Sequence, residues 1–269
     1  MTPDLIVVGS LKSRHEQEDA LRQIEKLEVP AIACVTSGLR FLKHPLLDHS
    51  RDFSGLKAEN ILKLGGRVVA KGITQLLEKI PPSPPFSKEG ESEAIAKIIS
   101  CTDWREHALF LGNSMPIRDM DTHAIAGEHI PIVGANRGAS GIDGIISTAC
   151  GFAHGLNQPT VLVLGDMTFL HDVSGLSFLK DLHVPVTIVV INNQGNGIFR
   201  TLPIASETEL FERYFLVPHT YNLSGACQIY GIRHQPVDAS HFKACYNEAL
   251  QSEKSQVIEV LTCAYKPKL

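Results

Sequence analysis

The sequence has no excess of charge of either sign. Its 269 residues include 25 basic and 29 acidic side chains, which gives a formal net charge of −4. Because a basic excess is missing, the composition gives no indication of binding to nucleic acid or to an anionic membrane surface. The sequence also lacks a secretory leader and an apolar run long enough to span a bilayer. We therefore expect a cytoplasmic protein without a membrane span.

Paired cysteines are also missing. The six cysteines are scattered and form no Cys-x-x-Cys motif, a spacing that implies neither a disulfide framework nor a zinc site. We expect most of them to be small buried apolar residues in a reducing compartment. The hydrophobic content of 43% and the chain length are sufficient for one large or two modest domains with apolar cores.

The most informative stretch of the chain runs from 161 to 199. Two apolar runs, 161–164 and 186–191, predict buried β-strands, and apolar residues at helical spacing lie between them at 176–182. Strand, helix and strand with short breaks are typical of a βαβ unit in a parallel sheet that is buried on both faces. Such units bind ligands at the carboxyl ends of their strands.

A polar cluster ends each of these two strands. Gly165 and Asp166 follow the first, and the four residues 192–195 follow the second. Asp166 offers a carboxylate, Asn193 an amide oxygen and Gly195 a backbone carbonyl, a set of hard oxygen donors that suits Mg²⁺ bound to phosphates. Either cluster alone would be read as an ordinary turn. Together, with Asp166 and Asn193 27 positions apart across one βαβ unit, they predict a site for a metal ion and a diphosphate.

Two arginines follow other predicted strands. The strand at 108–112 precedes Arg118, and the strand at 130–134 precedes Arg137. The arrangement predicts both arginines at the same edge of the sheet as Asp166. The guanidinium fork suits bidentate capture of a carboxylate, although a single arginine is more often a solvated surface cation.

Four motifs carry a resemblance to a known family. They are GNSMPIRDMD (112–121), NRGASGIDG (136–144), GDM (165–167) and NNQGNGIF (192–199). The last two resemble the motif that holds Mg²⁺ against thiamine diphosphate, and this pair alone indicates only that superfamily. All four together resemble the 2-succinyl-5-enolpyruvyl-6-hydroxy-3-cyclohexene-1-carboxylate synthase family of menaquinone and phylloquinone biosynthesis.

The resemblance implies a set of site residues. Asp166, Asn193 and the carbonyl of Gly195 would hold Mg²⁺ or Mn²⁺. The apolar residues among those named below are equally plausible as part of the hydrophobic core. The resemblance assigns no role to His171. The further residues implied for cofactor binding are Ser140, Gly141, Ile142, Gly165, Met167 and Thr168. Those implied for substrate binding are Asn113, Ser114, Arg118, Arg137, Ile198, Phe199 and Leu202.

The resemblance also implies an activity. The family is a thiamine diphosphate-dependent transferase that decarboxylates 2-oxoglutarate and adds the resulting succinyl carbanion to isochorismate. Its activating glutamate lies in a pyrimidine-binding domain that we expect to precede Met1, so no catalytic residue is expected in this sequence. Family sites are shared between subunits, so we expect a homodimer or an association with a chain that carries the pyrimidine domain. A non-catalytic fragment that binds thiamine diphosphate and Mg²⁺, or another thiamine diphosphate-dependent 2-oxo acid enzyme, is the alternative.

The expected fold class is α/β, with a doubly wound parallel sheet over 94–269 as the diphosphate-binding domain. Residues 1–80, with strands at 5–9 and 29–35 around a helix at 16–27, predict a truncated Rossmann-like middle domain. Four prolines within 81–93 predict a linker between the two domains. In the middle domain, Gly72 stands where the resemblance would place a substrate-binding arginine, beside Lys71.

Overall fold

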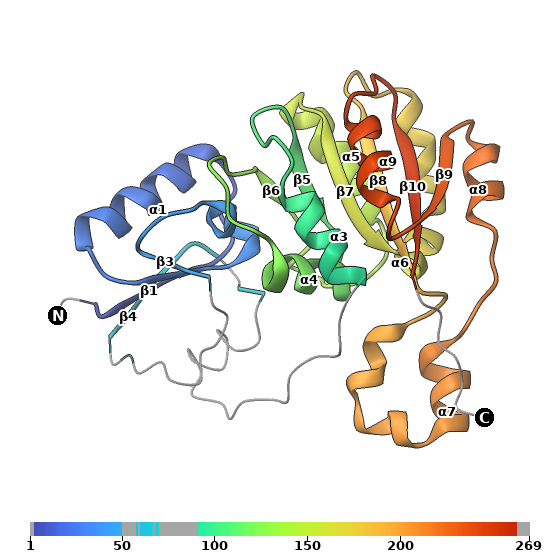
Figure 1. Cartoon of the computed structure of the whole chain (residues 1–269), viewed down its shortest axis with the longest axis horizontal. Helices are drawn as coiled ribbons and strands as arrows, with labels where there is room; N and C mark the ends of the chain where they lie inside the picture. The colour runs from blue at the N-terminus through green and yellow to red at the C-terminus, as the bar shows by residue number, and fades with distance from the viewer. Residues whose placement is uncertain (1–2, 50–57, 59, 67, 70–90, 263–269) are drawn as a thin grey trace.

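The computed structural model describes residues 3–49, 58, 60–66, 68–69 and 91–262. These residues form two sheets that lie side by side (Figure 1). The predicted linker lies outside the described residues except for its last three positions, and Lys71, Gly72 and 73–80 lie outside them as well. Helix α3 (Glu91–Ser100) begins three residues before the predicted boundary at 94, since acidic residues in its first turn favour a helix start.

The first sheet comes from the start of the chain. Its elements are β1 (Leu5–Val8), α1 (Arg14–Leu27), β2 (Ala31–Ala33), the 3₁₀ helices η1 (Val35–Ser37) and η2 (Leu39–Phe41), β3 (Leu47–Asp48) and β4 (Ile61–Leu64). All strands are parallel in the order β3-β2-β1-β4. Helix α1 begins where the Ser13 hydroxyl accepts a hydrogen bond from the Glu16 backbone N–H, which satisfies one free helix donor. The predicted first strand, helix and second strand are confirmed.

The second sheet is larger and is also parallel throughout, in the order β6-β5-β7-β8-β10-β9. Its strands are β5 (Ala108–Leu111), β6 (Val133–Gly134), β7 (Thr160–Gly165), β8 (Val186–Asn192), β9 (Arg233–Asp238) and β10 (Gln256–Leu261). Strand β6 is shorter than the predicted strand at 130–134. The sequence pattern did not predict β9, because its residues are mostly polar and include Pro236. An edge position tolerates proline, since one side of the strand needs no partner.

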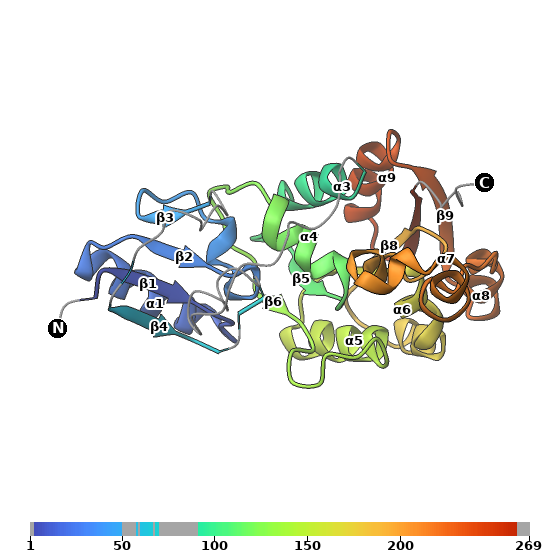
Figure 2. The same ribbon diagram turned by 90° about the horizontal axis from the view of Figure 1, so that it is seen from below.

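Helices cover both faces of the second sheet, as the view in Figure 2 shows. Alternate residues along each strand point to opposite faces, so Val161 and Val163 enter one apolar core while Leu162 and Leu164 enter the other. The first face is covered by α3, α4 (Met115–His123) and α9 (Phe242–Leu250). The second is covered by α5 (Ile145–Leu156), α6 (Asp166–His171), the 3₁₀ helix η3 (Val173–Lys180) and α8 (Leu223–Ile229).

The connection between β7 and β8 is helical as predicted, but it is not one α-helix. Short α6 is followed by η3, which has three residues per turn. Leu176 and Leu179, three positions apart, therefore share the buried side, whereas Phe178 is 53% exposed. Residues 208–216 are likewise divided into α7 (Thr208–Phe211) and a π-helix, η6 (Glu212–Leu216).

The two sheets share a continuous core. Val7 and Ile32 of the first sheet belong to the same buried apolar cluster as Trp104 and Ile117. The rings of Phe41 and Trp104 meet edge to face, with 5.6 Å between centroids. This packing fixes the first sheet against helix α4 and therefore against one end of the second sheet.

One expectation from composition, that most cysteines are buried, is confirmed within the described part of the chain. Four of its five cysteines are buried, and all five are free thiols. None of its helices is both long and apolar enough to cross a membrane.

Trp104→Ala should weaken the core that joins the two sheets. Removing this fully packed ring leaves a cavity, so the free energy of unfolding should fall by about 3–5 kcal/mol. Urea denaturation followed by circular dichroism measures the loss, since the variant has no tryptophan left for fluorescence. Phe178→Ala, which truncates an exposed ring, is the control and should cost less than about 1 kcal/mol. Equal losses in both variants would contradict the shared core.

Candidate functional site

The carboxyl ends of three neighbouring strands meet at one edge of the second sheet. Strands β5, β7 and β8 are adjacent and parallel. The register pairs Leu111 with Val163, and Gly165 with Ile191. The loops that follow these strands therefore leave the sheet side by side, as the sequence predicted.

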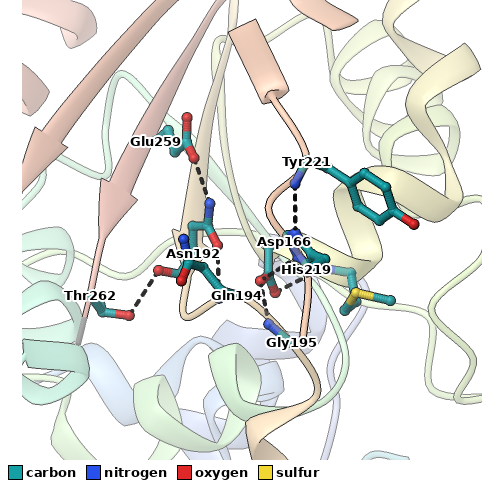
Figure 3. Close-up of polar contacts among 9 residues, drawn as sticks. Asp166, Asn192, Gln194, Gly195, His219, Tyr221, Glu259 and Thr262 are labelled. Atoms are coloured by element: carbon teal, nitrogen blue, oxygen red, sulfur yellow. Dashed lines mark hydrogen bonds and ion pairs between the residues drawn. The ribbon is translucent and has the colours of Figure 1, made fainter. Parts of the chain in front are cut away.

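Asp166 is the residue that connects these loops. It opens α6 directly after β7 and is 3% exposed. Its Oδ1 accepts a hydrogen bond from the Met167 backbone N–H at 2.8 Å. Its Oδ2 accepts from the Gly195 backbone N–H at 2.9 Å and contacts His219 Nε2 at 3.0 Å (Figure 3). One carboxylate thus joins the end of β7, the loop after β8 and a third segment of the chain.

The surroundings of Asp166 favour a bound cation. Burial raises the pKa of the Asp166 carboxyl, and the hydrogen bonds from Met167, Gly195 and His219 act in the opposite direction. A nearby positive charge would favour the ionised form of such a buried acid. Because Oδ2 already has two hydrogen-bond partners and Oδ1 has one, Oδ1 is the oxygen with more free capacity for a metal ion.

The loop at 192–197, here named the metal loop, has backbone dihedral angles that restrict which residues can occupy it. Gln194 has a φ of 60° and Gly195 a φ of 151°. A Cβ atom at Gly195 would lie 2.6 Å from the carbonyl oxygen of Leu216, so only glycine fits. The Gln194 backbone N–H donates to Asn192 Oδ1 at 2.9 Å, which closes the turn at the end of β8.

Asn192 is itself anchored by a buried polar network. Its Nδ2 donates to Glu259 Oε1 at 2.5 Å, and His234 Nε2 lies 2.8 Å from Glu259 Oε2. Burial alone would raise the pKa of Glu259, but the hydrogen bonds from His234 and Asn192 hold it below its ordinary value. The network ties the end of β8 to β10 and β9, so the strand from which the metal loop starts is rigidly placed.

The donors available at this edge are oxygen atoms. The Asn193 amide lies against Gly197, and the structure gives it no hydrogen-bond partner among the described residues. In the described ranges no group of three His, Cys, Asp or Glu side chains forms a metal cluster. One carboxylate with amide and carbonyl oxygens remains as the donor set, and this set fits a hard divalent cation such as Mg²⁺.

Asn113, which the resemblance names for substrate binding, is hydrogen-bonded within the protein. Its side chain is buried and donates to the carbonyl oxygens of Gly141 at 2.7 Å and Asn136 at 3.1 Å. Its Oδ1 accepts from Arg137 Nη1 at 2.8 Å. Asn113 therefore folds the 136–141 loop onto the end of β5 and orients Arg137, and only one acceptor position is left on its oxygen.

Arg118 lies on α4, next to the same strand end. Its Nη1 donates to the carbonyl oxygen of Ser114, and burial lowers its pKa. Ser114 precedes α4 with a φ of 72°, a conformation that is uncommon for a residue other than glycine. Arg118 therefore lies in the first turn of the helix that follows β5, and Arg137 lies in the loop that follows β6.

The remaining predicted residues lie around this edge with different exposures. The structure brings the 140–142 loop next to α6, where Asp143 Oδ1 lies 3.4 Å from His171 Nδ1. The side chain of Thr168 is only 2% exposed. Ser140 and Gly141 are exposed, whereas Ile142, Gly165, Met167 and Ile198 are half-buried.

An excursion of the chain lies beyond the metal loop. Residues 197–217, here named the excursion, extend past the sheet edge at the bottom of Figure 1 and contain η4 (Gly197–Thr201), η5 (Pro203–Ser206), α7 and η6. Phe199 and Leu202 are 36% and 43% exposed, and the Phe199 ring packs edge to face on Phe215. The excursion is closed at its neck, because the Asn196 N–H donates to the Leu216 carbonyl at 2.8 Å.

His219 was not predicted from the sequence. It lies 53 positions after Asp166, in an irregular segment, and no spacing or strand end singles it out. His219 reaches the Asp166 carboxylate because the two ends of the excursion are held together, which returns the chain to the sheet edge.

Asp119 is a second unpredicted feature. It is 7% exposed, and its Oδ2 is buried without a hydrogen-bond partner. Its neighbours, which include Ile95, Ile99 and Val163, are apolar. Burial raises the pKa of Asp119 to about 7, against the opposing effect of Arg118.

Comparisons with known proteins agree with this geometry. Residues 134–260 match the family described as "Thiamine pyrophosphate enzyme, C-terminal TPP binding domain". A curated 2-succinyl-5-enolpyruvyl-6-hydroxy-3-cyclohexene-1-carboxylate synthase of Chlorobium limicola is 48% identical over 167 residues, which are 61% of this chain and 29% of that protein. The synthase of the same name from Chlorobium phaeobacteroides is 33% identical over 325 residues, 95% of this chain and 56% of that protein.

The chain spans about half the length of the curated relatives that match nearly all of it. The alignment with the C. phaeobacteroides synthase is longer than this chain, so that relative contains internal residues without a counterpart here. In three dimensions the chain resembles the crystal structure of benzoylformate decarboxylase from Polynucleobacter necessarius, with a TM-score of 0.63 and 17% identity. The match covers 99% of this chain and 63% of that one, and it confirms the predicted fold class.

Asp119→Asn should change how stability depends on pH. An aspartate in an unfolded chain titrates near pH 4, whereas folded Asp119 titrates near 7. Between these values the folded state keeps a proton that the unfolded state has lost, so the wild type loses stability as the pH rises. The variant lacks this titration, and its free energy of unfolding relative to wild type should rise from pH 4 to pH 8 by on the order of 3 kcal/mol. Urea denaturation at both pH values measures this, and a constant difference would refute it.

Proposed function

We propose that the chain is a thiamine diphosphate enzyme, as its match to the cofactor-binding domain of that family over 134–260 supports, and that its sheet edge binds the cofactor's diphosphate through a divalent metal ion. The Asp166 carboxylate, the Asn193 amide oxygen and the Gly195 carbonyl would hold Mg²⁺ or Mn²⁺. The observation that carries this proposal is the hydrogen bond of 2.9 Å between Gly195 N–H and Asp166 Oδ2. It places a buried carboxylate from β7 against the loop that follows β8.

We assign the rest of the cofactor contacts to two loops. In the 140–142 loop, Ser140 and Gly141 are exposed, so their backbone is open to a ligand, and Ile142 would pack against the cofactor. The loop after β7 contributes its backbone, because the side chain of Thr168 is buried. The residues concerned there are Gly165, Met167 and Thr168.

We propose that the complete enzyme carries out the synthase reaction. It would decarboxylate 2-oxoglutarate and add the succinyl unit to isochorismate, in menaquinone or phylloquinone biosynthesis. The printed names of the curated relatives support this assignment. When bound, thiamine diphosphate stabilises the negative charge that decarboxylation leaves at the reacting carbon.

The chain's own residues would recognise the two anionic substrates. Arg137, held by Asn113 Oδ1 at 2.8 Å, and Arg118 would bind carboxylates, with Ser114 beside them. The apolar side chains at the start of the excursion would exclude water from the reacting groups. These residues are Ile198, Phe199 and Leu202.

We propose that 94–269 is the diphosphate domain and that 1–80 corresponds to the middle domain of the family. Activation of the cofactor would then require the family's pyrimidine domain with its glutamate, in a site shared within a homodimer or with another chain that carries this domain. The second candidate function is a module that binds thiamine diphosphate and Mg²⁺ without turnover. Assays of the chain alone and mixed with a pyrimidine domain separate the two.

Asp166→Ala should abolish cofactor binding. Isothermal titration of thiamine diphosphate with Mg²⁺ into the purified chain should give saturable, Mg²⁺-dependent binding. The variant should lose on the order of 100-fold in affinity or more, since a ligand matters at least as much as its supporting residues. Asp103→Ala removes an exposed acid before β5, at the opposite end of the sheet, and should bind like wild type. Binding that is absent in wild type, or equal in both variants, would refute the metal site.

Arg137→Ala should impair substrate use in the complete enzyme. With a pyrimidine domain present, kcat/KM for 2-oxoglutarate or isochorismate should fall by about 10- to 100-fold, the loss of a charge-assisted pair. Arg105→Ala, which removes an exposed arginine paired with Asp103, is the matched control. Unchanged kinetics for both substrates in Arg137→Ala would show that this arginine does not bind substrate.

A further inference from the structure

His219 is a buried imidazole inside the proposed metal site that belongs to none of the proposed ligands. Its side chain is 4% exposed, and so is that of Asp166, which it contacts. It follows the neck of the excursion and reaches the site from the side opposite to the sheet (Figure 3).

The position of the proton on this imidazole follows from its neighbours. The Tyr221 backbone N–H donates to Nδ1 of His219 at 3.2 Å, and an imidazole nitrogen that accepts a hydrogen bond carries no proton. In the neutral ring the proton therefore lies on Nε2. Nε2–H then donates to Oδ2 of Asp166, 3.0 Å away.

Two further contacts hold His219 in place. It stacks on the Tyr221 ring, with centroids 5.1 Å apart and 21° between the planes. The His219 backbone N–H donates to the Gln194 carbonyl at 3.2 Å, which attaches the residue to the metal loop. The donor is thus preorganised and does not need to move when a ligand binds.

We propose that His219 is a positioning residue that holds Asp166 in the orientation needed for metal binding. This inference rests on the function proposed above. With Nε2–H of His219 and N–H of Gly195 both on Oδ2, the carboxylate cannot rotate freely, and Oδ1 is presented to the cation. Without His219, Oδ2 keeps a single donor, and the carboxylate gains rotational freedom that metal binding must remove.

Direct ligation by His219 is the competing interpretation. An imidazole binds a metal through a nitrogen without a proton, and here Nε2 carries the proton while Nδ1 accepts from Tyr221. Ligation would require both hydrogen bonds to be rearranged. The geometry therefore favours a supporting role over a coordinating one.

The test compares His219→Ala with His219→Gln. The Gln amide nitrogen can reach the place of Nε2 and donate the same hydrogen bond, whereas Ala cannot. Mn²⁺ affinity is measured by electron paramagnetic resonance at saturating thiamine diphosphate, so the readout is independent of activity. We expect Mn²⁺ to bind about 10- to 100-fold more weakly to His219→Ala and within about threefold of wild type to His219→Gln.

His44→Ala is the matched control. It also removes a largely buried imidazole whose Nδ1 accepts from the backbone N–H two residues later and whose Nε2 contacts a carboxylate, but this carboxylate belongs to Glu25 of α1 and not to Asp166. An equal loss of Mn²⁺ affinity in this control, an unchanged affinity in His219→Ala, or no rescue by Gln would overturn the proposal. Detection of a nitrogen bound directly to Mn²⁺ in pulsed electron paramagnetic resonance spectra of the wild type would overturn the proposal as well. If Asp166→Ala retains Mn²⁺, the proposed function itself fails, which distinguishes the two failures.

Discussion

A buried carboxylate must be hydrogen-bonded or paired with a charge, and the site depends on how this constraint is met at Asp166. Its three hydrogen-bond partners come from three parts of the chain: α6, the metal loop and the segment after the excursion. The contacts with Gly195 and His219 are available only if β7 and β8 are neighbours in register. The stability of the fold and the arrangement of the donors are therefore consequences of the same pairing.

The parts of the structure that depend on local pattern were predictable. The apolar runs of β7 and β8 and the polar residues at their ends indicated both the parallel sheet and the edge at which we propose that the cofactor binds. Edge strand β9 was missed because a polar strand with a proline has no apolar signature. The helix between β7 and β8 was predicted in place but not in type, since short apolar spacings fit an α-helix and a 3₁₀ helix about equally well.

The roles of single side chains depended on long-range contacts and were less predictable. The resemblance named Asn113 as a substrate ligand, and this stays a prediction, but no sequence pattern indicated its hydrogen bonds to Asn136, Gly141 and Arg137. His219 had no sequence signal, because its contact with Asp166 depends on a segment that returns to the sheet after a 21-residue excursion (197–217). Residues that are proposed to contact a ligand can be identified from a motif more readily than the residues that hold them in place.

The closed neck of the excursion has a consequence for how this fold can diversify. Asn196 and Leu216 are tied together next to the metal loop, so the chain between them is a loop with fixed ends. Lengthening such a loop costs little, about 0.6 kcal/mol for a doubling of its length. Insertions and deletions there would reshape the apolar surface of the excursion without moving the metal loop. Changes in the length of this loop can therefore alter which substrate such an enzyme accepts, while the residues proposed to bind the cofactor stay in place.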